Sequence, residues 1–312
     1  MHRYRRGERA AAPGGPLNDY ELLRRRVLFE VWFPGEQEVV LRARVCKSCG
    51  LVAYAPRPSA TDLDAKYEFL GRFERTGASD PSEAGALMDR ERAARTRDAA
   101  DEALGREATR VLDFGGGDGK LLAPFLERGA EGAVIDHNRK PLPGVTRLGA
   151  TLDDAQADGS YDAIIASHVL EHLAGPASAL RALRGFIAPE GVIVSEVPLE
   201  VWKGAPIARD PVTHVNFFTT GTLAELHERS GWRIVDARAL RGSYADARKE
   251  VAVVVAGTGG GPPSITKCGA EEAERLLDPG IGTELTRAWR SRRIPSARGV
   301  ARRLGLVRGE RA

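Results

Sequence analysis

Short apolar runs of strand length recur along the chain from residue 110 onward, and stretches with helical periodicity separate them. The helical stretches lie near residues 119–128, 176–187 and 220–231, between the strand-like runs RVLDF, GAVID, YDAIIAS, GVIVSEV and VAVVVA. Buried strands that alternate with helices predict a doubly wound, mostly parallel α/β sheet with helices on both faces. The runs WRIVDARAL and KEVAVVVA have no helix-length segment between them, which predicts an antiparallel pair that closes the sheet.

The regions on either side of this α/β pattern differ in composition. Residues 1–18 are dominated by Arg, Gly, Pro and Ala, which predicts a disordered tail. Residues 19–106 contain a strand-like VVLRARV, a cysteine pair, the turn-rich APRPSATD, a short helical YEFLGRF and a helix rich in Ala, Arg and Glu. We expect these residues to form a ribbon-like and helical cap on an α/β domain over 107–256, and residues 257–312 to form a basic C-terminal extension.

Composition excludes several classes of protein. The chain carries 46 Lys and Arg against 43 Asp and Glu, and the small excess lies mostly at the two ends, so we expect no nucleic-acid partner. The Arg-rich C-terminal tail has no aromatic residue beyond Trp289 for stacking on bases, so we expect it to be solvated or to contact a second copy in a homodimer. No apolar run is long enough to cross a bilayer, and the arginines at the N-terminus are not followed by the apolar segment of a signal peptide. With only 3 cysteines, we expect a cytoplasmic protein without a disulfide framework or a membrane partner.

A glycine-rich loop joins the first apolar strand to the helix that follows it, in the segment DFGGGDG. Glycine permits positive φ and lets a backbone turn approach a ligand closely. The spacing does not fit a phosphate-binding P-loop, because Phe114 and Leu121 occupy two of its required positions. It does not fit the Gly-x-Gly-x-x-Gly/Ala fingerprint of dinucleotide-binding folds either, because Lys120 replaces the third glycine. The pattern that remains is Asp-x-Gly-x-Gly-x-Gly, formed by Asp113, Gly115, Gly117 and Gly119.

This pattern resembles motif I of the class I S-adenosylmethionine-dependent methyltransferases, a family with a Rossmann-like, seven-stranded sheet. The acid at the strand end suits a cofactor that carries an ammonium group. Asp136, at the end of the second strand, is placed to accept hydrogen bonds from both ribose hydroxyls. The resemblance further implies that Leu152 and Asp153 contact adenine and that Ser167 contacts the methionine end of the cofactor. A solvated loop over residues 149–154 is the alternative to the adenine contact.

The segment Ser167-His168-Val-Leu-Glu171-His172 places three polar side chains on one helical face, at i, i+3 and i+4. It matches the inverted zincin pattern His-x-x-Glu-His, but that site needs a long helix, and Gly175-Pro176 follows after a single turn. It also resembles the Glu-x-x-Glu-His signature of small-RNA 2′-O-methyltransferases and ubiquinone-pathway O-methyltransferases, whose metal organises the acceptor hydroxyl. A metal would then bind Glu171, His172, His168 and His214. In the third interpretation, which is the one we expect, the segment lines the cofactor cleft and holds no zinc or magnesium.

His214 lies after the fifth strand, in the segment DPVTHVNFFT. This segment resembles the His-x-x-Phe/Tyr-Phe stretch of methyltransferases from polysaccharide and antibiotic-sugar pathways, in which a histidine overlooks the transferred methyl group. Imidazole has a pKa near neutrality and can accept the proton that an alcohol loses as it attacks. We therefore expect His214 to act as the base, with His168 as the second candidate catalytic residue. Packing of His214 beneath Phe217 and Phe218 is the alternative.

Cys46 and Cys49 form half of a zinc ribbon, a Cys-x-x-Cys knuckle followed by glycine. Together with Pro56-Arg-Pro and Tyr67, the knuckle resembles the leader of bacterial sugar-pathway methyltransferases, in which two such knuckles share one zinc. The first knuckle is missing here, because VLFEVWFPGEQEVV contains no Cys or His. We expect a ribbon that has kept its shape without metal; zinc completed by a partner or by Cys268 is the alternative.

These resemblances imply an enzyme that transfers the methyl group of S-adenosylmethionine to a hydroxyl of a sugar or small secondary metabolite. We expect the two reactants to be positioned at the carboxyl ends of the strands, under a roof formed by residues 19–106 and 199–218. C-methylation of a keto sugar and methylation at nitrogen are the alternatives within the enzyme class. A non-catalytic protein that keeps the fold for binding or scaffolding is the alternative outside it.

Overall fold

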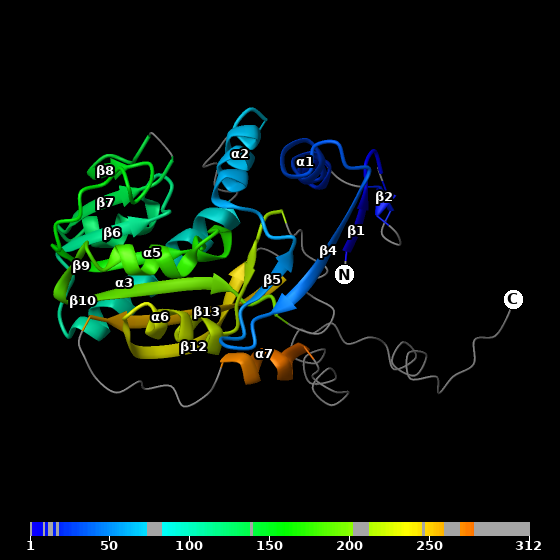
Figure 1. The fold of residues 1–312 in the computed structure, drawn as a ribbon. Helices are drawn as coiled ribbons and strands as arrows, with labels where there is room; N and C mark the ends of the chain where they lie inside the picture. Colours follow the sequence, from blue (N-terminus) through cyan, green and yellow to red (C-terminus); the bar gives the residue numbers. More distant parts are fainter. Residues whose placement is uncertain are drawn as a thin grey trace, which may run out of the picture.

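The computed structural model describes residues 2–8, 10–11, 15–16, 19–73, 83–137, 140–201, 212–244, 247–258 and 269–277. Its main element is a seven-stranded sheet with the strand order β12-β13-β10-β9-β6-β7-β8 (Figure 1). The strands are β6 Arg110–Phe114, β7 Glu131–Ile135, β8 Val145–Gly149, β9 Tyr161–Ser167, β10 Ile187–Pro198, β12 Arg233–Tyr244 and β13 Ala247–Gly257. The doubly wound, mostly parallel α/β fold predicted from the sequence is confirmed.

Strand direction also follows the sequence pattern. Strands β10, β9, β6, β7 and β8 run parallel to one another, whereas β13 runs antiparallel to both β10 and β12. A parallel connection needs a crossover of a dozen or more residues. The chain between β12 and β13 is far shorter than that, so the two strands pair antiparallel as predicted.

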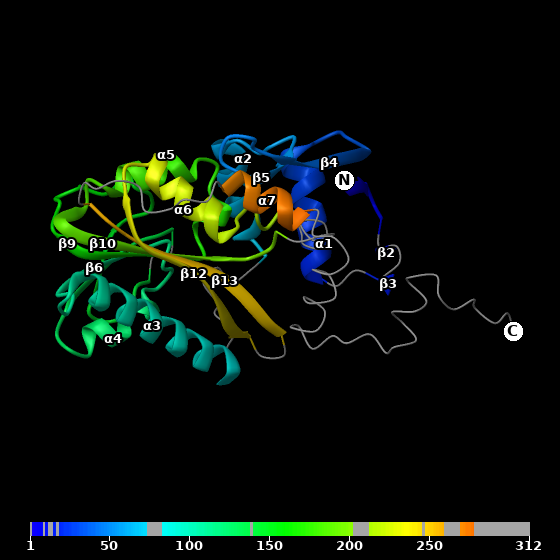
Figure 2. The same cartoon turned by 90° about the horizontal axis from the view of Figure 1, so that it is seen from below.

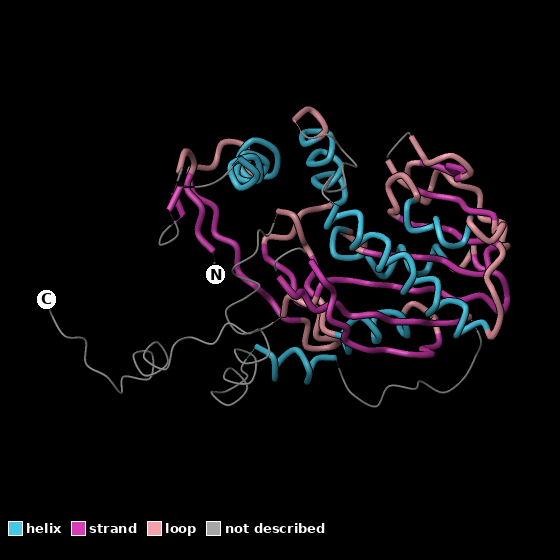
Figure 3. The backbone as a smooth tube through the Cα atoms, turned by 180° about the vertical axis from the view of Figure 1, so that it is seen from behind, coloured by secondary structure: helices cyan, strands magenta, loops and turns pink. Residues whose placement is uncertain are grey.

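Helices cover both faces of the sheet (Figure 2). On one face lie α3 Glu83–Leu104 and α4 Ala123–Leu126, and on the other lie α5 Pro176–Leu183 and α6 Thr220–Arg229. Figure 3 shows α3 from the opposite side, lying across the strands. Neighbouring side chains of a strand point to opposite faces, so Ile164 of β9 packs with α5 and α6 while Ile165 packs with α3. Both are fully buried, which explains the nearly continuous apolar run in β9.

The residues that precede α3, called the leader from here on, contribute three strands to a second, four-stranded sheet with the order β1-β4-β5-β11. A turn joins β4 Glu38–Val45 to β5 Val52–Ala55, and β11 Asn216–Phe217 adds antiparallel to β5. Because β11 comes from the segment after β10, it ties the leader to the α/β domain. The leader sheet lies beyond the carboxyl end of β10, which is the edge at which the site is built (Figure 1).

The N-terminal tail differs from the sequence prediction. His2–Arg5 forms β1, which pairs antiparallel with β4, and β2 Ala10–Ala11 pairs with β3 Gly15–Pro16, so residues 1–18 are not disordered throughout. The edge of β4 has backbone groups that β1 satisfies, and the tail arginines Arg3 and Arg5 form ion pairs with Glu38. Composition could not reveal this partner, because Glu38 lies 33 residues from Arg5 in the sequence.

The leader also contains α1 Asp19–Arg26, the π-helical segment η1 Val27–Trp32 and α2 Ala60–Leu70. Helix α2 begins earlier than the predicted YEFLGRF because Ser59 and Asp62 form a capping box. Asp62 N donates to Ser59 Oγ at 3.2 Å, and Ser59 N donates to Asp62 Oδ2 at 2.8 Å.

Helix α7 Gly269–Leu277 packs against α6. Among the helices of the described ranges, none combines the length and the apolar character needed to cross a bilayer. The predicted Arg-rich tail and Cys268 lie outside the described residues.

Candidate active site

The glycine-rich loop follows β6 at the carboxyl edge of the sheet. Gly115, Gly117 and Gly119 have φ angles of 73°, 63° and 85°, in the left-handed region that side chains disfavour. A Cβ atom at Gly115 would also lie 2.5 Å from Val169. The chain then enters η2 Lys120–Leu122, so the three glycines singled out in the sequence make the turn between strand and helix.

Asp113, the acid at the end of β6, is fully buried beneath this loop. Neither of its carboxylate oxygens has a hydrogen-bond partner among the described residues. Burial raises its pKa to about 7, against the opposing charge of Arg92 and with added repulsion from Asp136 and Asp118. A buried carboxylate without a donor fits the ammonium group of a bound ligand, which would supply both positive charge and N–H donors.

Gly116 leaves room for the Asp113 carboxylate, and sequence reasoning missed it. A Cβ atom at this position would lie 2.0 Å from Oδ2 of Asp113. In the Asp-x-Gly-x-Gly-x-Gly pattern this position is one of the variable ones. Glycine is needed here because the Asp113 side chain comes too close for a Cβ atom, and not because the backbone has a positive φ angle.

Asp136 follows β7 and faces the glycine loop. Its Oδ2 accepts a hydrogen bond from the backbone N–H of Gly117 at 3.0 Å. The neighbouring His137 stacks on Tyr67 of α2, with ring centroids 6.4 Å apart. Burial raises the pKa of Tyr67 to about 12, and the charges of Glu171 and Asp136 act in the same direction. The leader thus brings an aromatic side chain to the region between Asp136 and Glu171.

The two residues predicted near adenine lie in different surroundings. Leu152 is half-buried and packs against the core, whereas Asp153 is exposed. The neighbouring Asp154 accepts hydrogen bonds from Thr151 N and Oγ1, both at 2.9 Å, and so holds this turn.

Ser167 and His168 stand at the carboxyl end of β9. Ser167 is buried, and its hydroxyl has no hydrogen-bond partner among the described residues. His168 has a φ of 55° and lies between two buried carboxylates: Nδ1 is 3.3 Å from Glu171 Oε1, and Nε2 is 3.3 Å from Glu196 Oε1. Burial opposes its charge, but the adjacent carboxylates of Glu171 and Glu196 raise the pKa of His168 to about 9. His168 is therefore an imidazolium at neutral pH.

Arg95 of α3 completes this charged arrangement. Its Nε and Nη2 donate to Glu196 Oε2 at 3.1 and 2.6 Å. Burial opposes the charge of Glu171, but its pKa falls to about 2 because the His168 ring lies next to it, with Nδ1 3.3 Å from Glu171 Oε1. Two buried carboxylates, Glu171 and Glu196, therefore lie against two half-buried cations, His168 and Arg95, and no local sequence motif contains all four residues.

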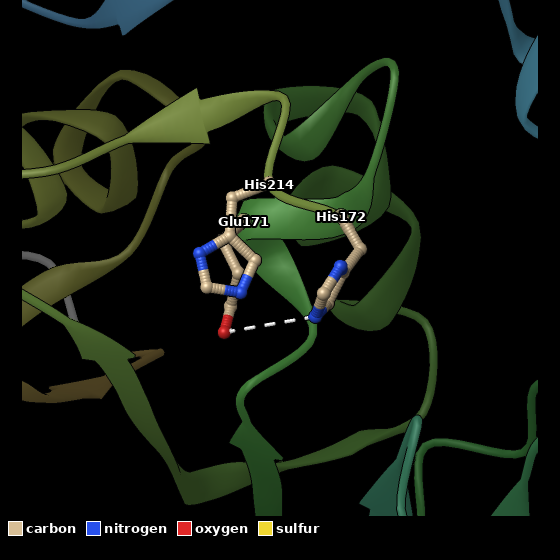
Figure 4. Close-up of side chains that lie close together, drawn as sticks. All are labelled: Glu171, His172 and His214. Atoms are coloured by element: carbon tan, nitrogen blue, oxygen red, sulfur yellow. Dashed lines mark ion pairs between the residues drawn. The ribbon is translucent and has the colours of Figure 1, made fainter. Parts of the chain in front are cut away.

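Glu171, His172 and His214 converge beside this group, as Figure 4 shows. One ligand atom from each lies within 4.8 Å of the other two. Burial lowers the pKa of His172 to about 4, so its ring is neutral. Thr213 O lies 2.8 Å from His172 Nδ1. The other ring nitrogen, Nε2, therefore faces Glu171, at 3.9 Å from Oε1. The fourth metal ligand considered in the sequence, His168, lies outside this cluster, because both of its ring nitrogens face carboxylates.

His214 is held by Glu200, a second residue that sequence reasoning missed. His214 Nδ1 donates to Glu200 Oε2 at 2.6 Å, and Glu200 is only 5% exposed. The other ring nitrogen, Nε2, points toward Glu171 and His172 (Figure 4). Glu200 follows β10 by two residues, so its place at the carboxyl edge of a parallel strand was the available signal.

Hydrogen bonds fix the segment that carries His214. Val215 N donates to Glu171 O at 2.9 Å, and Asn216 Nδ2 donates to the carbonyl oxygens of Leu170 and Leu173 at 2.8 and 2.7 Å. Arg57 of the leader donates to Asn216 Oδ1 at 2.6 Å. These contacts, together with the Glu200 hydrogen bond, join three parts of the chain around His214: the leader, the end of β10 and the helical segment η3 Leu170–His172.

Residues 88–237 match a family described as a methyltransferase domain. The ubiquinone biosynthesis O-methyltransferase of Aeromonas salmonicida (strain A449) is 30% identical over 162 residues, which cover 44% of this chain and 68% of that protein. The chain belongs to the S-adenosylmethionine-dependent methyltransferases. The ubiquinone biosynthesis O-methyltransferase of Pseudomonas aeruginosa (strain LESB58) is 33% identical to this methyltransferase over 107 residues. The matched part spans 46% of that relative's length.

A solved structure agrees with the fold of this methyltransferase. The 1,6-didemethyltoxoflavin-N1-methyltransferase of Burkholderia thailandensis, solved with 1,6-didemethyltoxoflavin and S-adenosylhomocysteine, is 19% identical and aligns with a TM-score of 0.52. The alignment covers 70% of this chain and 99% of that one. The predicted methyltransferase class and its cofactor are confirmed; the acceptor and the roles of individual residues stay predictions.

Proposed function

We propose that this methyltransferase transfers the methyl group of S-adenosylmethionine to a hydroxyl of a small acceptor, a sugar or a secondary metabolite, with His214 as general base. The observation that carries the proposal is the 2.6 Å hydrogen bond from His214 Nδ1 to Glu200. A hydroxyl attacks only as it loses its proton, and a fixed imidazole is suited to accept it.

The Glu200 contact selects the tautomer of His214. With Nδ1 carrying the proton that Glu200 accepts, Nε2 is left with its lone pair toward the cluster of Glu171 and His172. When Nε2 takes a proton, the resulting imidazolium lies next to the carboxylates of Glu171 and Glu200. These carboxylates stabilise the charge that develops on His214 during transfer.

S-adenosylmethionine, when bound, supplies an electrophilic methyl group on a sulfonium sulfur. Asp113 would receive its ammonium group, and Asp136 would accept hydrogen bonds from the ribose hydroxyls. Gly115, Gly117 and Gly119 would let the backbone approach the cofactor, with Leu152 beside adenine and Ser167 beside the methionine end. The orphaned Asp113 carboxylate supports this assignment, and the exposed Asp153 contributes least to it.

His168 has a positioning role in this proposal instead of acting as a base. Its ring is charged at neutral pH and both nitrogens face carboxylates, so it has no lone pair to offer an acceptor. It holds Glu171 and Glu196 in place beside the reacting groups.

Two lines of support bear on the acceptor. The names of the relatives describe O-methyltransferases of ubiquinone biosynthesis, which favours oxygen over carbon or nitrogen as the methylated atom. The sugar assignment rests on the resemblance of the His214 segment to polysaccharide and antibiotic-sugar enzymes. A hydroxylated aromatic acceptor would also be methylated on a hydroxyl that loses its proton to a base, so the same test includes it.

The test measures release of S-adenosylhomocysteine with panels of sugar nucleotides and polyhydroxylated aromatics, and locates the added methyl by mass spectrometry and NMR. We expect an O-methyl product, and a His214→Asn variant that binds S-adenosylmethionine normally but turns over about 10²–10⁴-fold more slowly. A C-methyl or N-methyl product, or full turnover by His214→Asn, would overturn the proposal.

A further inference from the structure

Cys46 and Cys49 lie in the turn between β4 and β5, and the proposed function does not use them. Cys46 is exposed and Cys49 is half-buried. A hydrogen bond from Gly50 N to Cys46 O at 2.7 Å closes the turn, and Gly50 has a φ of +73°. Cys46 and Cys49 therefore stand at positions i and i+3 of one closed turn, and both thiols are free.

We propose that Cys46 and Cys49 are a thiol–disulfide exchange pair whose reaction partner is a low-molecular-weight disulfide. The Cys46 thiolate attacks one sulfur of that disulfide, forms a mixed disulfide and displaces the first thiol. Cys49 then loses its proton and attacks Cys46 Sγ, which forms the intramolecular disulfide and displaces the second thiol. Both cysteines are oxidised, and the small disulfide is reduced to two thiols.

The surroundings of the two thiols differ in the way that such a pair requires. The backbone N–H groups of Cys49 and Ser48 lower the pKa of the exposed Cys46, and the Arg229 guanidinium acts in the same direction. Burial raises the pKa of Cys49. An exposed thiolate suits the attacking role, and a shielded thiol next to it suits the resolving role.

The turn is also fixed from the side of the α/β domain. Arg229 Nη2 of α6 donates to Ser48 O at 2.9 Å, and a Cβ atom at Gly269 of α7 would lie 2.9 Å from Cys49 O. Contacts from α6 and α7 therefore hold the backbone of the turn that carries the two cysteines. Among the described residues, neither cysteine belongs to a group of three or more side chains able to hold a metal ion.

The test uses the full chain with Cys268→Ser, so that Cys46 and Cys49 are the remaining thiols. The reduced protein is equilibrated with glutathione buffers that contain increasing proportions of glutathione disulfide. It is then quenched with acid, alkylated and analysed by intact-protein mass spectrometry. We expect both alkylation sites to disappear together, with the loss of two hydrogens per chain. In that background Cys49→Ser should accumulate a glutathione adduct at Cys46. Cys46→Ser should form its adduct at Cys49 at least about tenfold more slowly, because Cys49 is half-buried and burial raises the pKa of its thiol.

Three results would overturn the proposal. Both thiols could remain open to alkylation in the most oxidising buffer, or each could carry its own glutathione with no internal disulfide. The protein could also retain a thiophilic metal on purification that protects both cysteines until it is chelated. Circular dichroism and S-adenosylmethionine binding of each variant confirm that the comparison is made between folded proteins.

Discussion

His214 Nδ1 and Glu200 Oε2 lie 2.6 Å apart, and this hydrogen bond joins the end of β10 to the segment that leads into β11. Glu200 is buried at the carboxyl edge of the sheet, so its carboxylate has lost most of its contact with water and is oriented by the ring it binds. The pair is arranged like the carboxylate–histidine half of a catalytic triad, in which the acid sets the tautomer of the base.

Replacing Glu200 with Gln should slow turnover about 10²-fold, because the amide can donate to Nδ1 and favour the tautomer whose Nε2 already carries a proton. S-adenosylmethionine affinity should stay unchanged. The measurement is kcat as a function of pH for wild type, Glu200→Gln and the matched control Glu190→Gln, an exposed glutamate of the same strand. Wild-type turnover and pH profile in Glu200→Gln would show that the dyad has no catalytic role.

The affinity for S-adenosylmethionine should depend on pH through Asp113. Its pKa in the ligand-free protein is raised to about 7, and a ligand ammonium favours the ionised form, so binding below pH 7 releases a proton. We expect the affinity to rise about tenfold between about pH 6 and pH 8 and then to level off. Calorimetric titrations in buffers of different ionisation enthalpy count the released proton directly. An affinity that does not change with pH, with no proton released at pH 6, would contradict the ionisation of Asp113 on cofactor binding.

Gly116→Ala should weaken S-adenosylmethionine binding at least about tenfold, because the new methyl group would lie 2.0 Å from Asp113 Oδ2 and displace the carboxylate. Gly105→Ala is the matched control: it places a methyl group at a φ of +67° with no atom within 4 Å. That control should cost about 1 kcal/mol of folding free energy and leave affinity unchanged. Equal affinities for the two variants would contradict the steric role of Gly116.

His168→Gln should lower the free energy of unfolding by about 3 kcal/mol near pH 6, because it leaves two buried carboxylates without the cation between them. The folded pKa of His168 is raised to about 9, so its contribution is fully present below the unfolded pKa of about 6.5 and is lost as the pH rises through 9. The difference between wild type and variant should therefore shrink between pH 6.5 and 9.

Urea denaturation across this pH range measures that difference, and His137→Gln, at an exposed position, is the control. A difference that stays constant from pH 6 to pH 9.5 would mean that His168 acts through packing alone.

Local patterns predicted much of the fold and pointed to the proposed cofactor residues. The alternation of buried strands and helices predicts the sheet, and the glycine spacing draws attention to Asp113 and Asp136, because both patterns depend on residues close together in the sequence. The tail strand β1 escaped prediction because its stability comes from β4, which composition does not report.

The proposed catalytic half of the site depends on contacts across the sheet. Glu200 and His214 are separated by 14 residues, and Arg95 and Glu196 by 101, so no local motif joins either pair. The charge of His168 follows from two carboxylates, one of them on another strand. Side chains of this kind are recognised only after the topology has brought the strand ends to one edge.

The most direct test of the account is isothermal titration of S-adenosylmethionine and S-adenosylhomocysteine into wild type and Asp113→Asn at about pH 8, where the Asp113 carboxylate is ionised. We predict one binding site per chain in wild type and about 100-fold weaker binding in a folded Asp113→Asn variant, the loss expected when a charge-assisted hydrogen bond is removed. Absence of binding to wild type, or wild-type affinity in Asp113→Asn, would contradict the assignment of the glycine loop and Asp113 as the cofactor site.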